Sequence, residues 1–172
     1  MLITNLTIFD FDGTLIDTEL PETGKGIWKE KTGREWPHIG WWSKPESLSL
    51  EHFANKPFNS VIEVYKQEKM KDDTMVVMLT GRCQSLSKYV RAILDHQNIE
   101  FDMYLYNYGG STFQNKITQI SEVLSNNPNI NDLRMFDDKH IPQFQTFGNE
   151  LITNKVINKF NITHVSKGKF LN

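Results

Sequence analysis

Short runs of apolar and β-branched residues recur along the chain, separated by longer segments in which apolar residues return every three or four positions. The short runs have the length and composition of strands that are buried on both faces. They lie at residues 6–12, 75–80, 102–106, 133–137 and 162–165. The pattern therefore predicts five strands.

The longer segments between these runs predict amphipathic helices. The apolar positions within 86–94 and within 113–124 follow the helical spacing, and the Asn-Asn-Pro run at 126–128 should end the second helix. Residues 60–63 have the Ser-x-x-Glu pattern of a capping box, which marks a helix start. A last helix is expected over 142–152, with its aromatic and leucine positions facing inward.

Strands that alternate with helices indicate parallel crossovers. The sequence therefore predicts an α/β fold with a doubly wound, mostly parallel five-stranded sheet. Ligands of such folds bind at the carboxyl ends of the strands. Asp10, Thr80 and Asp137 all stand at such ends, so three distant parts of the sequence point to one edge of the sheet.

The segment 15–58 differs from the rest, because it is rich in glycine, proline, tryptophan and charge and has no long period. It is too short to form an independent domain of normal core size. We expect a single domain over 1–172, with 15–58 as an irregular flap or small cap inserted after the first strand. Its four tryptophans have two readings. At least two are expected to form a small core of the insertion, and exposed ones could stack a nucleobase.

Composition limits the classes of function. The net charge of −2 argues against a broad basic surface for duplex DNA, although a small groove for a strand end stays open. No run approaches the roughly 18 apolar residues of a membrane span, and we find no secretory signal. The lone cysteine, Cys83, fits a reducing compartment. These features predict a cytoplasmic protein without a membrane partner, and none predicts an obligate protein partner.

Candidate chemistry begins at the first strand. Asp10 and Asp12 are two positions apart, so a continuous strand would put both carboxylates on the same side. Adjacent carboxylates repel each other unless a cation or a shared proton relieves them. An aspartate can also attack phosphorus and form an aspartyl-phosphate. A calcium loop is the weaker alternative, because Leu15 and Ile16 interrupt the oxygen ligands that it needs.

The segment 10–14, Asp-Phe-Asp-Gly-Thr, resembles the first motif of the haloacid dehalogenase (HAD) superfamily. The resemblance implies a Rossmann-like fold and an Mg²⁺-dependent phosphohydrolase. Asp10 would be the nucleophile and Asp12 the general acid and base. Dehalogenation is disfavoured, because that chemistry needs neither this motif nor a metal.

Two further segments resemble HAD motifs. Thr80 and Gly81 end a buried strand, as in the second motif, and would offer a hydroxyl and backbone N–H groups to phosphate. Arg82 could bind phosphate through both arms of its guanidinium or pair with a carboxylate. Lys116 resembles the lysine of the third motif, which balances the charge of the nucleophile and the phosphoryl group.

The acidic pair Asp137-Asp138 resembles the fourth motif. Mg²⁺ prefers oxygen ligands, and Asp10 with one of this pair would supply them. Asp138 is the favoured direct ligand and Asp137 the alternate one, while Asp12 could join through its backbone carbonyl. His140 is left open between a substrate contact and plain exposure.

More of the chain is similar to one branch of the superfamily, the HAD domain called Swiss Army Knife RNA repair-like. The similarity runs over about 5–166 and includes the Trp-Trp segment at 41–48. Lys139 and His140 follow the acidic pair at once, which departs from that family's spacing. The resemblance implies a phosphatase for nucleotides or nucleic-acid ends, with a phosphorylated small molecule as the other substrate class. A phosphotransferase, or a silent module that binds a nucleic-acid end or a protein, is the alternative.

Overall fold

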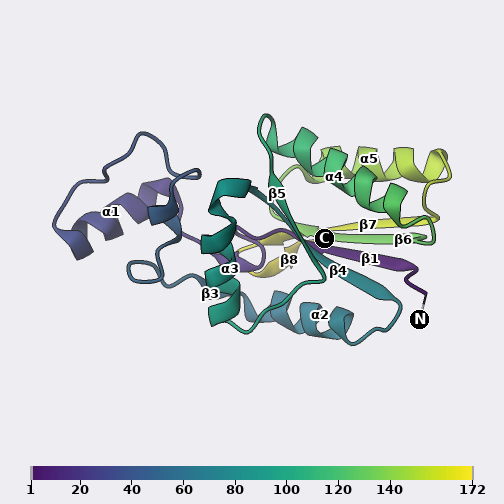
Figure 1. Cartoon of the computed structure of the whole chain (residues 1–172), viewed down its shortest axis with the longest axis horizontal. Coiled ribbons are helices and arrows are strands. Elements are labelled where there is room, and N and C mark those ends of the chain that lie inside the picture. Colours follow the sequence, from purple (N-terminus) through teal and green to yellow (C-terminus); the bar gives the residue numbers. More distant parts are fainter. Residues whose placement is uncertain (1, 172) are drawn as a thin grey trace.

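A computed structural model describes residues 2–171 as one central sheet with helices on both faces (Figure 1). The sheet has the strand order β5-β4-β1-β6-β7-β8. All neighbouring pairs are parallel except β7 with β8. The strands are β1 (Asn5–Phe9), β4 (Thr74–Cys83), β5 (Met103–Asn107), β6 (Asp132–Asp137), β7 (Lys159–Ser166) and β8 (Lys169–Leu171).

The predicted α/β fold and its five strands are confirmed, and a sixth strand is added. β8 is only three residues long, which is too short to show a strand pattern in the sequence. It pairs with β7 through a tight turn at Lys167 and Gly168, both of which have positive φ. It forms an antiparallel edge on an otherwise parallel sheet.

Helices cover both faces of the sheet (Figure 1). One face carries α2 (Asn59–Lys69) and α3 (Ser87–His96), and the other carries α4 (Thr112–Asn126) and α5 (Ile141–Thr153). All four lie where helices were predicted, and α4 ends before the Asn-Pro pair. Within residues 2–171, no helix combines the length and the hydropathy that crossing a membrane requires.

β1 lies at the centre and alternates between the two layers. Leu6 and Ile8 belong to the core under α4 and α5, whereas Phe9 belongs to the core under α2 and α3. Both faces of β1 are therefore buried, which explains its nearly uninterrupted apolar sequence. The strand is held in register by β4 on one side and β6 on the other.

The predicted capping box is wrong. Helix α2 begins at Asn59, and its N-cap residue, Phe58, makes no side-chain cap. Ser60 lies inside the first turn, and its hydroxyl donates to the carbonyl of Gly168 in the turn before β8. Ser60 thus makes a contact with a residue far away in the sequence in place of the predicted local cap.

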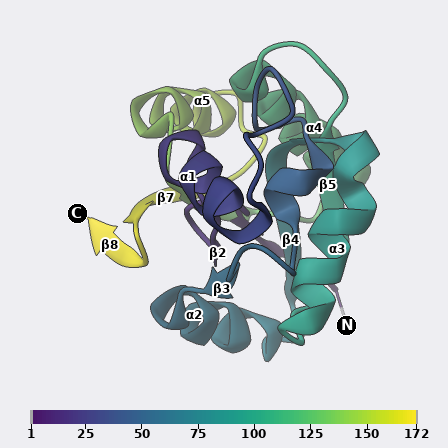
Figure 2. The same ribbon diagram turned by 90° about the vertical axis from the view of Figure 1, so that its left-hand side faces the viewer.

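The insertion after β1 projects from one end of the sheet and contains a helix that the sequence did not predict (Figures 1 and 2). This helix, α1 (Pro21–Thr32), has few apolar residues and two glycines, so its helical period is faint. The insertion also contains the 3-10 turn η1 (Pro45–Leu48). Its ends are joined by β2 (Ile16–Asp17) and β3 (Lys56–Pro57), which pair antiparallel. The chain thus leaves and re-enters the main body at this pair of short strands.

Aromatic rings form the interior of the insertion. Trp41 is buried, its indole N–H donates to the Glu19 carbonyl at 2.9 Å, and its ring packs against Trp36 and Phe53. Trp28 in turn packs edge-on against Trp36. Three of the four tryptophans therefore belong to one cluster within the insertion. Trp42 is exposed over 38% of its surface.

Candidate active site

Asp10 and Asp12 reach one cavity by a route that differs from the predicted one. β1 ends at Phe9, and Asp12 lies in the turn that follows rather than on the strand. The turn folds back because the amides of Gly13 and Leu15 donate to the carbonyls of Ile16 and Asp10. Both aspartates line a cavity of about 280 Å³ at the carboxyl end of the sheet.

Lys116 links the nucleophile candidate to the acidic pair. It extends from the first turns of α4, is buried, and donates to Asp10 Oδ1 at 2.8 Å and to Asp137 Oδ2 at 2.6 Å. These two carboxylates end neighbouring strands, β1 and β6. Of the three residues expected at one sheet edge, Asp10 and Asp137 thus lie together, bridged by Lys116.

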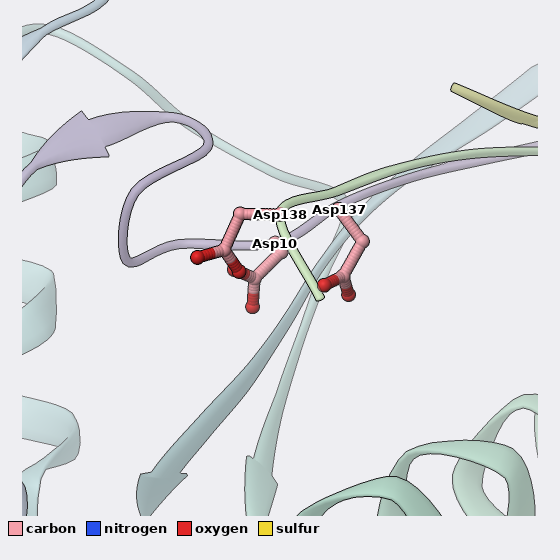
Figure 3. A group of neighbouring side chains, drawn as sticks. All are labelled: Asp10, Asp137 and Asp138. Atoms are coloured by element: carbon pink, nitrogen blue, oxygen red, sulfur yellow. The ribbon is translucent and has the colours of Figure 1, made fainter. Parts of the chain in front are cut away.

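Asp138 completes a group of three carboxylates (Figure 3). Asp10, Asp137 and Asp138 each offer an oxygen, and these oxygens all lie within 4.8 Å of one another. A side chain at Gly13 would put its Cβ 2.9 Å from Asp138 Oδ2. Gly13 also has a φ of +73°, which only glycine adopts without strain. This glycine allows the loop after β1 to pass close to Asp138.

The carboxylate group is electrostatically unfavourable by itself. Burial raises the pKa of Asp10 well above its usual value; the Lys116 ammonium opposes this, while the charges of Asp137 and Asp138 add to it. Burial also raises the pKa of Asp138, against the opposing charge of Lys139. A divalent cation among these oxygens would favour their charged forms.

The donor set suits Mg²⁺. Oxygens on opposite sides of a Mg²⁺ ion are about 4 Å apart, so this group could close on an ion through small side-chain movements. Asp137 is already engaged on both oxygens, by Lys116 and by the Lys139 amide at 2.9 Å. The nearest cation to Asp138 is Lys139 Nζ at 3.9 Å. Asp138 is therefore the less engaged carboxylate of the acidic pair, and its role as the direct ligand stays a prediction.

β4 does not end at Thr80 as predicted but continues to Cys83, and its register with β5 shifts between Leu79 and Cys83. This last part of β4 brings three predicted site residues to different positions. Gly81 and Arg82 line the cavity, and a side chain at Gly81 would collide with Thr112, at 2.8 Å from its methyl group. Thr80 is buried, and its hydroxyl accepts a hydrogen bond from the Arg82 amide at 3.1 Å. Phosphate binding by these residues stays a prediction.

Arg82 pairs with a carboxylate, the second of its two predicted partners, and that carboxylate is Asp12. Its Nε donates to both oxygens of Asp12, at 3.1 and 3.0 Å, and Nη2 donates to Oδ1 at 2.8 Å. Thr18 also donates to Oδ1, at 2.8 Å. Nη1 reaches the insertion, where it donates to the Trp42 carbonyl and to Ser47, both at 2.8 Å. One buried guanidinium thus connects Asp12 to the insertion.

Asp12 is not a member of the carboxylate group around the candidate ion position. Its carboxylate instead accepts hydrogen bonds from Arg82 and Thr18. The prediction that Asp12 joins the metal through its backbone carbonyl stays a prediction.

Several cavity residues were missed or left unassigned by the sequence reasoning. Thr112, Trp42, Lys139 and His140 all line the cavity. His140 has a φ of 56° and precedes α5, and its ring packs against Phe113. Left-handed backbone at a non-glycine residue is strained and is often found at functional sites. For Trp42, the available signal was the expectation that an exposed tryptophan of the insertion could stack a nucleobase.

Comparison with solved structures agrees with the fold. The HAD domain of the effector protein Lem4 from Legionella pneumophila is 16% identical, with a TM-score of 0.56, over 98% of this chain and 90% of that chain. A chain of the Pnkp1/Rnl/Hen1 complex is 15% identical, with a TM-score of 0.56, over 98% of this chain and 47% of that chain. No curated protein sequence matches. Residues 27–171 match the model of HAD domain family 1 in Swiss Army Knife RNA repair proteins, and the chain therefore belongs to this family.

Proposed function

We propose that the protein is an Mg²⁺-dependent phosphomonoesterase that works through an aspartyl-phosphate on Asp10. The observation that carries the proposal is that one cavity contains two carboxylates, Asp10 and Asp12, in different environments. Asp10 lies among Lys116, Asp137 and Asp138, and Asp12 lies apart from them under Arg82. This division suits a nucleophile and a separate proton carrier.

In the first step a carboxylate oxygen of Asp10 attacks phosphorus. The bond between phosphorus and the leaving oxygen breaks, and Asp12 gives its proton to that oxygen. Asp12 Oδ1 accepts three hydrogen bonds, from two nitrogens of Arg82 and from Thr18, whereas Oδ2 accepts one. Oδ2 is therefore the oxygen that we expect to carry the proton.

In the second step Asp12, now a carboxylate, accepts a proton from water as the water oxygen attacks phosphorus. The bond between phosphorus and Asp10 breaks, and inorganic phosphate and the free Asp10 carboxylate are released. Lys116 supplies a fixed positive charge beside Asp10 during both steps. Thr80 and the Gly81 backbone are proposed to hold phosphoryl oxygens.

The residues that would hold Mg²⁺ are Asp10 and Asp138, with Asp137 as the alternate ligand. When bound there, the ion supplies positive charge to the phosphoryl oxygens and to the nucleophile. The residues 15–58 are proposed to act as a small cap, because Arg82 ties them to the cavity through Trp42 and Ser47. Membership of an RNA repair family supports a nucleotide or a nucleic-acid end as the substrate.

The test is the turnover of a generic phosphomonoester by purified protein with Mg²⁺. Asp10→Asn and Asp12→Asn should each lower kcat at least a hundredfold. Asp17→Asn is the matched control, since Asp17 is exposed on the short strand β2. With a substrate whose phosphoryl group is radiolabelled, the label should become covalently bound to wild-type protein and to Asp12→Asn, but not to Asp10→Asn. Wild-type turnover by Asp10→Asn would refute the nucleophile. Metal binding without turnover on any phosphomonoester would favour the silent module, and transfer to an acceptor alcohol would favour the phosphotransferase.

A further inference from the structure

Trp42 and Lys139 are among the cavity residues that have no part in the proposed chemistry. Trp42 reaches the cavity from the insertion, and Lys139 reaches it from the loop after β6. The Lys139 side chain is exposed over 59% of its surface, and its ammonium lies 5.2 Å from the centre of the Trp42 ring. An aromatic plane and an exposed cation thus lie next to each other at the cavity.

The Trp42 ring lies close to where a leaving group must depart. Arg82 Cζ is 4.8 Å from the centre of this ring, and Arg82 Nη2 is 2.8 Å from Asp12 Oδ1. The ring centre is therefore within about 9 Å of the Asp12 carboxylate. Because Asp12 is the proposed proton donor to the leaving oxygen, the group attached to that oxygen has to pass beside Trp42.

The Trp42 ring lies outside the aromatic cluster of the insertion. Trp28, Trp36 and Trp41 form the aromatic cluster of the insertion through contacts with one another. The ring contacts found for Trp42 in residues 2–171 are instead with the two cations, Arg82 and Lys139. A large aromatic side chain that is partly exposed in a cavity and outside the local core is available to a ligand.

Lys139 is the cavity cation with the weakest internal pairing. Lys116 lies within 2.8 Å of two carboxylates, and Arg82 is buried with hydrogen bonds from all three of its nitrogens. Lys139 Nζ lies 3.9 Å from its nearest carboxylate oxygen, on Asp138. It can therefore leave the Trp42 ring and meet an anion of the substrate, while Arg82 stays in place.

We infer that Trp42 and Lys139 recognise the leaving group, which is a nucleoside at the end of a nucleic-acid strand. Its base stacks on Trp42, and its phosphodiester contacts Lys139. This inference rests on the proposed function and assigns its specificity. A cavity of about 280 Å³ has room for a phosphoryl group and little more than one residue of a leaving group. A phosphotyrosine ring would also suit Trp42, but its single phosphate would be at Asp10 and would leave Lys139 without an anion.

The experiment compares matched substrates on matched variants. The substrates are a short oligonucleotide with a terminal phosphate, at the 5′ or the 3′ end, the same oligonucleotide with an abasic terminal nucleotide, and the corresponding mononucleotide. The variants are Trp42→Leu and Lys139→Gln. Trp42→Leu leaves the backbone carbonyl that accepts from Arg82. The controls are Phe170→Leu, an aromatic residue of similar exposure on β8, and Lys66→Gln on the exposed side of α2.

Trp42→Leu should lower the ratio of kcat/KM for the intact over the abasic oligonucleotide by about tenfold. Lys139→Gln should lower the ratio for the oligonucleotide over the mononucleotide and flatten its dependence on salt. Neither control should change its ratio. The inference is overturned if Trp42→Leu keeps the wild-type ratio, or if wild-type protein prefers a phosphotyrosine peptide to the oligonucleotides.

Binding separates this inference from the proposed function. Asp10→Asn protein with Mg²⁺ is titrated with the intact and the abasic oligonucleotides, and tryptophan fluorescence is followed. Tighter binding of the intact strand, lost in Asp10→Asn/Trp42→Leu, would support base recognition even if wild-type protein had no turnover. Equal binding of the two strands would overturn it even if phosphatase activity were found.

Discussion

The guanidinium of Arg82 holds the carboxylate of Asp12 in a fixed plane, with Nε shared between the two oxygens and Nη2 on Oδ1. The same guanidinium uses its remaining arm on the insertion, at the Trp42 carbonyl and the Ser47 hydroxyl. The position of the insertion and the orientation of Asp12 therefore depend on one buried side chain. With Asp12 as the proposed proton carrier, the placement of the insertion therefore bears on proton transfer through Arg82.

Arg82→Lys should lower kcat by about a hundredfold with a smaller change in KM. A lysine keeps the positive charge, but it cannot match the planar geometry with which Arg82 holds Asp12 and the insertion together. Steady-state kinetics on a generic phosphomonoester measure the effect, and a circular dichroism spectrum checks that the variant is folded.

A double variant tells whether this loss operates through Asp12. Added to Asp12→Asn, Arg82→Lys should cost much less than it costs in the wild-type background, because the group that it orients is already disabled. Full additivity of the two losses would mean that Arg82 acts on the substrate directly, as in the other prediction made for it from the sequence.

Asp138→Asn should weaken Mg²⁺ binding at least tenfold, because it removes the freer carboxylate of the acidic pair. Isothermal titration with Mg²⁺ measures this without relying on turnover. Asp137→Asn should lower stability as well, since it removes a buried partner of Lys116. Asp17→Asn serves as the control for both. Equal Mg²⁺ affinity of Asp138→Asn and the wild type would remove Asp138 from the ligand set.

Glu68→Gln should lower the free energy of unfolding at pH 7 by about 1–3 kcal/mol and leave turnover unchanged. Glu68 is buried and accepts hydrogen bonds from Thr7, Lys71 and Arg134, at 2.9, 2.7 and 2.9 Å. Burial opposes its ionisation, but these hydrogen bonds and the charges of Lys71 and Arg134 outweigh burial, so its pKa lies below the usual value.

The lowered pKa of Glu68 determines how its contribution to stability depends on pH. A carboxyl group with a lowered pKa in the folded state stabilises the protein above the usual glutamate value, and this stabilisation is lost as the pH falls through the lower, folded-state pKa. The gap between wild type and Glu68→Gln in urea unfolding should therefore be constant from pH 8 to about pH 5 and narrow below about pH 4.5. Glu63→Gln, at an exposed position of the same helix, should show neither effect. A gap that widens with acidification would contradict the account of Glu68.

The sequence predicted the parts of the site that depend on local patterns. Asp10 and Asp137 follow buried strands, and parallel strands bring such ends together, so their meeting could be foreseen. The partner of Arg82 could not, because it depends on how the turn after Phe9 folds back and places Asp12 off the strand. Helix α1 was missed because its few apolar residues give only a faint helical period, and its contact with Trp41 at Gly24 joins positions that are distant in the sequence. Recognition by Trp42 and Lys139 depends on contacts across the chain, which no local pattern encodes.

Two glycines of α1 provide the last prediction, which concerns the attachment of this helix to the aromatic cluster. A side chain at Gly24 would put its Cβ 2.1 Å from a ring carbon of Trp41, whereas one at Gly26 would meet nothing within 4 Å. Gly24→Ala should therefore displace α1 from Trp41 and increase hydrogen exchange across the insertion. It should also lower kcat/KM, because Trp42, which follows Trp41 in the sequence, lines the cavity. Gly26→Ala should stabilise α1 by up to about 1 kcal/mol, since alanine favours a helix over glycine, and should leave kcat/KM unchanged. Hydrogen exchange measured by mass spectrometry on both variants makes the comparison, and equal protection of the insertion in the two would show that α1 does not depend on its contact with Trp41.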